Sequence, residues 1–480
     1  MDALNRQSDG AVISRDTEGP SPGDFFCDYA AAHPELLDLA TFEPLTQQAR
    51  QIFPRLVDDA EDGYGLHPWP IFVDQPEAAA LARAVTGLAA LHRQLPARFF
   101  DNDPDQLRRF YGLESDLLAR LLVTPPTGVD ALFVRGDFIA TAHGWRCIEL
   151  NFGNLGGMQY APFADLYRDF PPFADFARDR GFALDHPSTL RAMFRHALAH
   201  RQVVPDAGPY HLAIVTADDQ SMNSALGHNL ELYRRILAEE AAAGDTVLHL
   251  LSDNDLEFRR RRVQAHGQRL HGIIEQSDRD TSRQMFRAFK AGSIDLYSCP
   301  VSMILGDKRN LGLLSQHGES DRFSPEERRL IADFVPWSRR IEAGPVTFRG
   351  RTLAMPELLR QEREALVLKA GDALGGTAVV IGPKTSSQDW QRAIDHALGE
   401  GSWMVQEYLE PQPYPLLRPG RGIEPHDIVW GAFAFGDEFG GLFARLAARR
   451  DTNGILNLSG GAQVGVPFLV HRSRRPRRTQ

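Results

Sequence analysis

Two short polar motifs inside apolar runs constrain this chain more than any other feature. Arg-Gly-Asp at 135–137 interrupts the run ALFVRGDF, and Glu-Leu-Asn at 149–151 interrupts WRCIELNF. Both runs have the composition of β-strands, on which side chains two apart share a face. Ala-His-Gly at 142–144 lies between them and suits a hairpin turn. The sequence therefore predicts a β-hairpin that carries two polar side chains on one face of each strand.

A turn centred on residue 143 would place Asp137 across from Glu149 and Arg135 across from Asn151. Facing side chains have their Cβ atoms about 5 Å apart, so two facing carboxylates repel each other. A divalent cation would relieve that repulsion, and carboxylate and amide oxygens suit Mg²⁺ when substrate phosphates complete its shell. Arg135 would then face the same phosphates. The alternative interpretation is a surface hairpin whose charges are solvated.

Length and composition narrow the class of protein. A chain of 480 residues is too long for one ordinary core, so two or three domains are expected. The formal net charge of -10 argues against a general nucleic-acid binder. Three cysteines without metal-type spacing fit a reducing compartment, and the N-terminus lacks the pattern of a signal peptide. No apolar run approaches the ~20 residues of a membrane span. We therefore expect a cytoplasmic protein with no nucleic-acid or membrane partner.

The pattern along the chain predicts helices first and a small sheet later. Residues 25–124 are expected to be mainly helical, because apolar residues recur there at helical spacing. In 188–300, two strand-like runs flank a long amphipathic helix, an order that predicts a small parallel sheet. Ligands bind such sheets beyond the carboxyl ends of the strands. Asp219 and Ser221 follow the first strand and are candidate substrate contacts, with an ordinary polar loop as the alternative.

A second polar group lies in the last third of the chain. Lys369 ends an apolar run and precedes a glycine-rich segment that contains Gly375 and Gly376. Glycines permit close backbone approach, successive N–H groups can cradle phosphate oxygens, and a lysine adds a point charge. Neither a P-loop nor a dinucleotide-binding fingerprint is present. The alternative to a phosphate-binding segment is a simple tight turn.

Two further features accompany that group. The strand WMVQEY ends in Gln406, Glu407 and Tyr408, and an exposed strand end can offer backbone N–H and C=O groups to a nucleobase edge. Lys308, in MILGDKRNLGLL, adds a second cation before a helical run. The alternatives are an ordinary polar strand end and a solvated surface lysine.

These pieces together resemble the circularly permuted ATP-grasp family, and most closely its glutathionylspermidine synthase branch. That family has Arg-x-Asp followed by Glu-x-Asn, then a lysine before a helix, a lysine-bearing strand with a glycine-rich loop, and a Gln-Glu-Tyr strand. The present chain has the same features in the same order over about residues 131–460. It departs from the pattern at Arg309 and Asn310, where the family tends to have small apolar residues, and we do not expect the hydrolase domain that is fused to some members.

The resemblance implies an α/β fold with α+β elements, namely an ATP-grasp fold in circularly permuted order. A small parallel-sheet substrate domain and an N-terminal helical segment would complete it. Composition and periodicity together with this resemblance give the expected organisation: a disordered lead-in at 1–24, helices and the metal-binding hairpin at 25–187, a small α/β substrate domain at 188–300, ATP-binding lobes with a glycine-rich lid at 301–470, and a basic tail at 471–480.

The resemblance also implies roles for individual residues. Asp137, Glu149 and Asn151 would hold one or two Mg²⁺, and Arg135 would be the catalytic residue that contacts the transferring phosphate. Asn154 would lie near the substrate, whereas Asp219 and Ser221 are substrate candidates only from their place after the strand. The implied ATP contacts are Arg135, Asp137, Lys308, Lys369, Gly375, Gly376, Gln406, Glu407, Tyr408 and Arg445, and Asn457 would line the phosphate site.

The activity implied is an ATP-dependent carboxylate–amine ligase that forms an amide or peptide bond through an acyl phosphate and releases ADP and phosphate. A phosphotransferase and a non-catalytic nucleotide-binding protein are the alternatives. The partners would be a small-molecule carboxylate and an amine. The sequence names neither substrate and leaves the oligomeric state open, a homodimer included.

Overall fold

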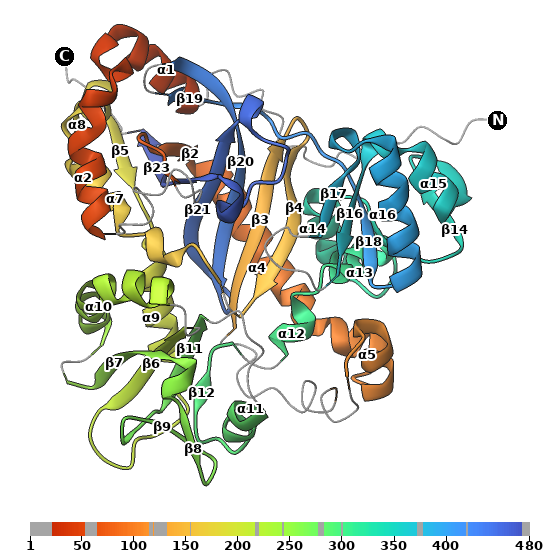
Figure 1. Ribbon diagram of the computed structural model, residues 1–480, viewed down its shortest axis with the longest axis horizontal. Coiled ribbons are helices and arrows are strands. Elements are labelled where there is room, and N and C mark those ends of the chain that lie inside the picture. The colour runs from red at the N-terminus through yellow and green to blue at the C-terminus, as the bar shows by residue number, and fades with distance from the viewer. Residues whose placement is uncertain are drawn as a thin grey trace.

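The computed structural model describes residues 22–52, 65–114, 119, 132–153, 155–216, 220–241, 244–276, 283–298, 301–371, 378–418 and 421–472. Helices and several sheets alternate in it, so the expected α/β fold class is confirmed. Figure 1 shows a central sheet with N-terminal helices at the upper left, a smaller sheet at the lower left and a third sheet at the right. Four candidate residues lie outside the described residues, namely Asn154, Asp219, Gly375 and Gly376.

The central sheet joins strands from both ends of the chain. Its order is β1 (Gly65–Leu66), β22 (Gln463–Gly465), β21 (Glu438–Ala448), β20 (Gly422–Phe435), β3 (Phe133–Thr141) and β4 (Gly144–Phe152), with β19 (Tyr414–Arg418) also paired to β20. The hairpin of β3 and β4 therefore lies directly beside the hairpin of β20 and β21, with β3 antiparallel to β20. This pairing brings polar residues of the two hairpins onto one surface.

Helix α4 (Gln75–Phe100) covers one face of the central sheet. It begins at a capping box, in which Asp74 and Glu77 each accept a hydrogen bond from the other's backbone N–H. Phe138 and Trp430, from β3 and β20, are buried in the core that this helix shares with the sheet. Because α4 fills this face, a polar site on the sheet has to lie on the opposite one.

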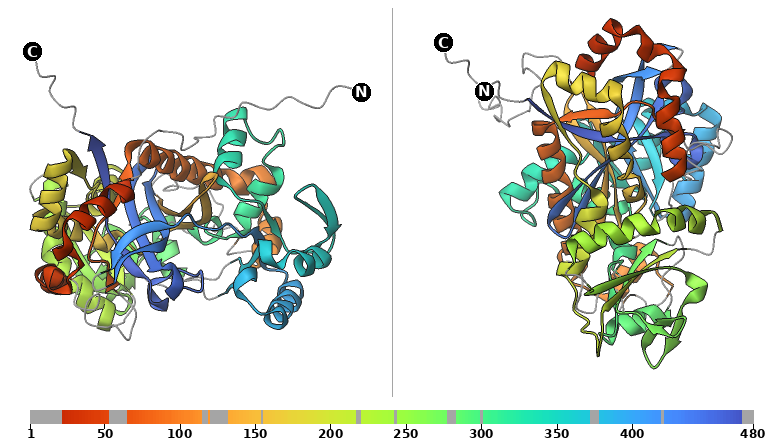
Figure 2. Two further views of the ribbon diagram at one scale, coloured as in Figure 1. Left: turned by 90° about the horizontal axis from the view of Figure 1, so that it is seen from above. Right: turned by 90° about the vertical axis from the view of Figure 1, so that its left-hand side faces the viewer.

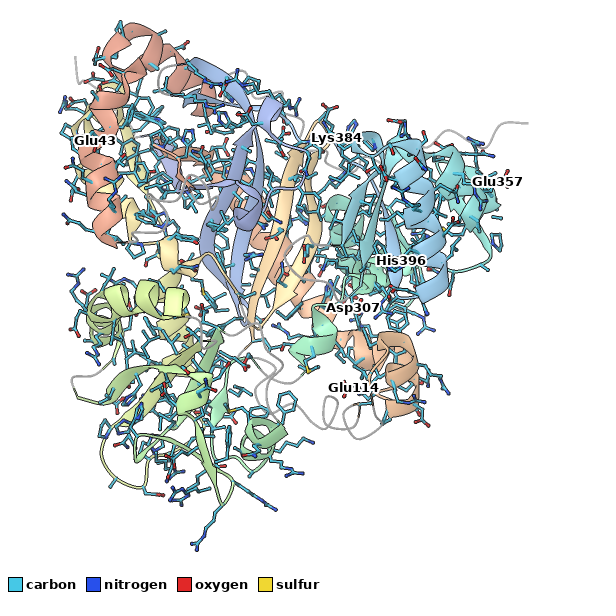
Figure 3. All side chains as sticks on the ribbon, viewed as in Figure 1. Glu43, Glu114, Asp307, Glu357, Lys384 and His396 are labelled. Carbon is cyan, nitrogen blue, oxygen red and sulfur yellow. The ribbon has the colours of Figure 1, made fainter. Side chains whose placement is uncertain are left out.

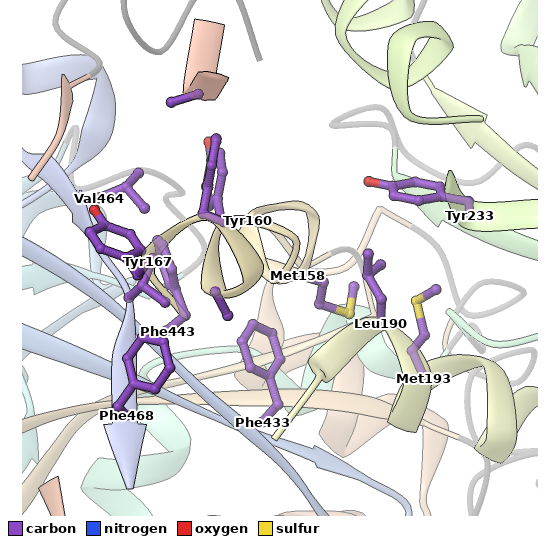
Figure 4. Close-up of a cluster of buried hydrophobic side chains, with 14 of the residues drawn as sticks. Met158, Tyr160, Tyr167, Leu190, Met193, Tyr233, Phe433, Phe443, Val464 and Phe468 are labelled. Carbon is purple, nitrogen blue, oxygen red and sulfur yellow. The ribbon is translucent and has the colours of Figure 1, made fainter. Parts of the chain in front are cut away.

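The opposite face is apolar over part of its length. Phe433 and Phe443, from β20 and β21, pack there with Tyr160, and the rings of Tyr160 and Phe443 are stacked at 5.5 Å. Leu190 of helix α9 (Thr189–Ala199) belongs to the same cluster, which Figure 4 shows. The other helices on the N-terminal side are α1 (Pro22–Ala32), α2 (Glu43–Ile52), α7 (Phe163–Asp169) and α8 (Pro171–Arg180).

The smaller sheet is parallel, as the β-α-β order of the sequence predicts. Its strands are β12 (Asp295–Leu296), β11 (Gly272–Gln276), β6 (Tyr210–Thr216) and β7 (Thr246–Ser252), accompanied by α10 (Gln220–Glu240), α11 (Arg283–Lys290) and a small sheet of β8 (Glu257–Arg259), β9 (Arg262–Ala265) and β10 (Gln268–Arg269). At the carboxyl end of β11, Gln276 Nε2 donates a hydrogen bond to the carbonyl of Leu155 at 3.4 Å. This edge of the small sheet therefore touches the segment that follows β4.

The third sheet is antiparallel. It consists of β13 (Ser338–Arg340), β18 (Trp403–Glu407), β16 (Leu366–Ala370) and β17 (Val379–Ile381), and its neighbours are α5 (Pro104–Tyr111), α12 (Ser302–Leu305), α13 (Arg309–His317), α14 (Pro325–Phe334), α15 (Met355–Gln361), α16 (Ser387–Glu400), β14 (Pro345–Phe348) and β15 (Arg351–Ala354). Trp390 and Ile394 of α16 are buried in the core of this lobe. In the left view of Figure 2 the third sheet lies on the opposite side of the central strands from α1 and α2.

Short strands interrupt the block that was expected to be mainly helical. Besides β1, residues Ile71–Asp74 form β2, which pairs in parallel with β23 (Pro467–Arg472), and β23 pairs in turn with β5 (Phe182–Asp185). A run of four residues carries too little periodicity to identify a strand, and the partner of β2 lies at the other end of the chain. No helix among the described residues has both the length and the apolar content needed to cross a membrane.

Candidate functional site

The hairpin predicted from the sequence is present with the predicted facing pairs. Strands β3 and β4 are antiparallel, with Asp137 opposite Glu149 and Arg135 opposite Asn151. On its other side Asp137 pairs with Gly431 of β20. The polar side chains therefore gather on the face of the central sheet that α4 does not cover.

The turn of the hairpin differs from the expected one, and a bulge compensates for the difference. Thr141 pairs directly with Gly144, so the three-residue turn is wrong and the turn has two residues. The register then shifts before Phe138, because Ile148 is an extra residue on β4 with no paired residue on β3. Cys147 consequently pairs with Phe138 and lies in the core shared with α4, although strand alternation would put it on the face of the acidic pair.

Asp137 is the centre of the site, and its side chain is only 3% exposed. Arg135 Nε donates to its Oδ1 at 2.8 Å, and Arg445 Nη2 donates to its Oδ2 at 2.6 Å. Burial alone would raise the pKa of the Asp137 carboxyl, but the two guanidinium groups outweigh burial and hold this pKa below its usual range. Asp137 therefore stays ionised at neutral pH and orients both arginines.

Arg135 lies across the sheet because the neighbouring strand leaves room for it. A Cβ atom at Gly431 would lie 3.1 Å from Arg135 Cδ, so the missing side chain makes space for the arginine. Arg135 Nη1 also donates to the carbonyl of Gly156 at 2.8 Å. Burial would lower the pKa of Arg135, yet Asp137 more than offsets it and the pKa is raised. The guanidinium thus links the acidic pair to the segment after β4.

Glu149 has a cationic partner of its own. Lys308 Nζ lies 3.2 Å from Glu149 Oε1, and the lysine side chain is 4% exposed. Asn151 Nδ2 lies 3.5 Å from Asp137 Oδ2. The repulsion expected between the facing carboxylates is therefore relieved here by arginine and lysine side chains, each carboxylate having a separate partner.

Lys369, at the end of β16, reaches the same hairpin from the third sheet. Its Nζ donates to the carbonyl of the bulge residue Ile148 at 2.8 Å and to Gln406 Oε1 at 2.7 Å. The pKa of Lys369 is lowered to about 8, chiefly by burial and also by Lys308, while Glu149 opposes the shift. The bulge thus supplies a carbonyl that holds a buried lysine beside the acidic pair.

The end of β18 differs in part from the expectation. The backbone N–H groups of Glu407 and Tyr408 donate to the carbonyls of Trp337 and Ala365, at 2.8 and 2.7 Å, so the structure engages them internally. The Glu407 carboxylate accepts a hydrogen bond from Arg349 at 2.7 Å. The idea that these two N–H groups are open to a ligand is therefore wrong, and the part of the Gln-Glu-Tyr motif that reaches the site is the Gln406 side chain.

A segment after β21 covers the outer end of the site face. Leu456 and Ala462 pack with Ile139 of β3, with Ile148 beside them. A cavity of about 190 Å³ is lined by residues of the segment 451–462 and by Ala447. Asn457, expected at the phosphate site, belongs to this segment, where its carbonyl accepts the N–H of Ala462 at 3.1 Å.

The remaining candidates are not brought to the hairpin by described contacts. Ser221 is the second residue of α10, beside the carboxyl end of β6, and the structure describes only its backbone. Two buried charged residues beside the site were not foreseen: Asp307 and Arg309, on either side of Lys308, form an ion pair at 2.5 Å. The signal was in the sequence, because three consecutive charged residues interrupt the apolar run MILGDKRNLGLL.

The donor set at the hairpin can be compared with what a metal ion requires. Among the described residues, no three His, Cys, Asp or Glu side chains form a cluster able to hold a metal. The available donors are the carboxylates of Asp137 and Glu149 and the amide of Asn151. This set is too poor in nitrogen and sulfur for Zn²⁺, but it fits Mg²⁺, which binds one or two carboxylates and completes its shell with water and phosphate oxygens.

Comparisons of the sequence with known proteins give no assignment. No model of a known protein family matches the chain. No curated protein matches its sequence significantly.

Comparison of the structure does find a similar protein. The fold is similar to that of a glutathione synthetase-like effector from Globodera pallida in its apo form, with a TM-score of 0.53. The match covers 84% of this chain and 90% of that chain, at 11% sequence identity. At this identity the similarity concerns the fold alone, so the chain has a fold of the glutathione synthetase-like kind.

Proposed function

We propose that this protein is an ATP-dependent carboxylate–amine ligase with an ATP-grasp fold in circularly permuted order. The observation that carries the proposal is the excess of positive charge, buried or largely buried, at the hairpin. Arg135 and Arg445 form ion pairs with Asp137, and Lys308 forms one with Glu149. Lys369 is close enough to Glu149 and Lys308 for both to shift its pKa. Four cationic groups against two carboxylates leave the set with two more positive than negative charges.

Buried like charges repel each other, so a protein gains no stability from collecting them around so few carboxylates. A polyphosphate ligand would neutralise the excess, and arginine and lysine are the residues that bind phosphate oxygens. A nucleotide triphosphate is therefore the ligand that this charge distribution fits best. The similar fold of a glutathione synthetase-like protein and the order of the family motifs along the chain support the same assignment.

Asp137, Glu149 and Asn151 would hold Mg²⁺, which when bound neutralises charge on the β- and γ-phosphates. Arg135 would donate to the transferring phosphoryl group, where charge builds up in the transition state. Asp137 would keep Arg135 and Arg445 oriented, because it remains ionised between them. Lys308 and Lys369 would bind the remaining phosphate oxygens or the adenine.

The reaction proposed has two steps. A carboxylate oxygen of the acid attacks the γ-phosphorus of ATP, ADP leaves, and an acyl phosphate forms. The amine nitrogen then attacks the acyl carbon, phosphate leaves, and the nitrogen loses a proton to give the amide. The acid and the amine would bind near the carboxyl edge of the small parallel sheet, which contacts the segment after β4 through Gln276.

A substrate screen tests this proposal. Amino acids, small peptides and polyamines are offered in pairs with Mg-ATP, phosphate release is measured, and products are identified by mass spectrometry. A ligase gives free phosphate and a product whose mass is the sum of the two substrates less water. A phosphorylated product would show a kinase instead.

Two variants connect the activity to the hairpin. We expect Arg135→Lys and Asp137→Asn to reduce ATP-dependent product formation at least 10²-fold, because each removes a bidentate contact at the centre of the site. Arg83→Ala is the control, since Arg83 forms a surface ion pair with Asp333 on the covered side. Circular dichroism checks that each variant is folded. Near wild-type turnover by either hairpin variant would show that the site is elsewhere.

A further inference from the structure

The charged residues on either side of Lys308 form a closed polar group inside the protein. Arg309 Nη2 donates to Asp307 Oδ2 at 2.5 Å, Arg309 Nε donates to Oδ1 at 2.9 Å, and the backbone N–H of Arg309 also donates to Oδ1 at 2.8 Å. The side chains are only 4% and 3% exposed. We call this pair the Asp307–Arg309 clasp. In Figure 3, Asp307 lies where α12 leads into the lobe of the third sheet.

The clasp is fixed to a helix from another part of the chain. Arg309 donates to the carbonyls of Phe110 and Tyr111, the last residues of α5, at 2.7 and 3.4 Å. The next residue, Asn310, accepts a hydrogen bond from the Tyr111 hydroxyl at 2.8 Å and donates to the carbonyl of Ile304 at 2.7 Å. The turn that carries Lys308 is therefore tied to α5 by two consecutive buried side chains.

The clasp also contacts the end of the strand that carries the second lysine. The backbone N–H of Lys308 donates to the carbonyl of Gly371 at 2.9 Å, and Gly371 lies two residues after Lys369. A Cβ atom at Gly371 would lie 2.6 Å from Arg309 Nε and 2.9 Å from Asp307 Oδ1. Only glycine fits this position, so the clasp is packed directly against the backbone that follows Lys369.

Stability alone does not account for the clasp. Burying an ion pair removes two charges from water, and well-packed apolar residues at the same positions are often as stable or more so. The surrounding run is apolar, so such residues would be compatible with it. What apolar residues cannot provide is the directional network from Arg309 to the Asp307 carboxylate and to two backbone carbonyls of α5.

We propose that Asp307 and Arg309 are positioning residues that set the placement of the two lysines at the nucleotide site. The clasp fixes the turn before α13 and the end of β16 against each other, and thereby directs Lys308 toward Glu149 and Lys369 toward the bulge carbonyl. Neither clasp residue contacts the nucleotide. This inference rests on the proposed function, because it assumes that the lysines bind ATP.

A double variant separates positioning from stability. Asp307→Leu with Arg309→Met removes both charges together, so neither is left unpaired in the interior. We expect this protein to melt within a few degrees of wild type and to bind Mg-ADP at least tenfold more weakly, as measured by titration calorimetry. The single variant Arg309→Lys retains the charge but not the bidentate geometry. We expect it, too, to bind Mg-ADP more weakly than the wild-type protein.

The matched control is Arg98→Met with Glu327→Leu, which removes another arginine–carboxylate pair, with a separation of 2.6 Å, from the α4–α14 contact. We expect Mg-ADP affinity in this control to stay within twofold of wild type. Wild-type affinity in the folded clasp double variant would overturn the positioning role and leave the proposed function standing. Absence of Mg-ADP binding by the wild-type protein would instead overturn the proposed function itself.

Discussion

At the scale of single residues, the site combines an ionised carboxylate with a buried lysine that ionises less readily than usual. Asp137 keeps its charge because two arginines outweigh the effect of burial on its pKa. Lys369 has its pKa lowered to about 8, because burial and Lys308 together outweigh Glu149. Near neutral pH, Lys369 is therefore a cation held in an unfavourable environment, and an anionic ligand would relieve it.

The lowered pKa of Lys369 predicts how stability depends on pH. In the unfolded chain a lysine has a pKa near 10.4, so between pH 8 and 10.4 the unfolded state binds more protons than the folded state. The free energy of unfolding should therefore rise with pH over this range, by up to roughly 3 kcal/mol from this residue. Urea unfolding of wild type and of Lys369→Met at several pH values measures the difference in slope. If the free energy of unfolding depended on pH in the same way in both proteins, the pKa of Lys369 would not be lowered in the folded state.

At the scale of secondary structure, the predicted hairpin has the correct facing pairs but the wrong turn length, and it lacks the bulge. Alternation along β3 and β4 correctly predicts the facing pairs Asp137–Glu149 and Arg135–Asn151. The prediction used a turn one residue too long and omitted the bulge at Ile148, and the two errors cancel beyond the bulge. Alternation within one strand cannot reveal a bulge, because a bulge is defined by how that strand pairs with its neighbour.

The neighbouring hairpin of β20 and β21 supplies Arg445, a residue of the site that alternation along β3 and β4 could not predict. Arg445 reaches Asp137 only because β21 lies one strand beyond β20, and this pairing depends on contacts between distant parts of the chain. The resemblance to a family, rather than the local pattern, was what identified Arg445. The clasp partner Arg309 was seen in the sequence only as a departure from the family pattern, because its acceptors on α5 lie about two hundred positions earlier.

The position of Gly431 between the two hairpins gives a test at this scale. A Cβ atom there would lie 3.1 Å from Arg135 Cδ and 3.2 Å from Phe443 Cδ1, so Gly431→Val should displace the Arg135 guanidinium. We expect turnover to fall roughly 10²-fold, because Arg135 is proposed to act on the transferring phosphate and small misplacements of such a group are costly. Gly399→Ala is the control, because no atom lies within 4 Å of the added Cβ. Unchanged turnover in the Gly431 variant would show that Arg135 need not occupy this position.

At the scale of the whole molecule, the site is assembled from three parts of the fold. The central sheet provides both carboxylates and both arginines, the third sheet provides Lys369, and the turn before α13 provides Lys308. The small parallel sheet meets this assembly through Gln276. Figure 1 shows the third sheet to the right of the β3–β4 hairpin and the small parallel sheet below it and to its left.

The sequence predicted the fold class and the parallel sheet, since both follow from local periodicity. It did not predict β1 and β2, whose parallel partners β22 and β23 are close to the C-terminus. Short strands of this kind are defined by the partner rather than by their own composition. Similarity to a glutathione synthetase-like fold at 11% identity is consistent with an architecture that very different sequences can adopt.

The most direct test of the central claim is a crystal structure of the protein with Mn²⁺ and a non-hydrolysable ATP analogue. We predict an anomalous manganese peak coordinated by oxygens of Asp137, Glu149 and Asn151, with Lys308, Lys369 and the two arginines around the phosphates. A nucleotide bound elsewhere on the protein, or a metal with no ligand from β3 or β4, would contradict it.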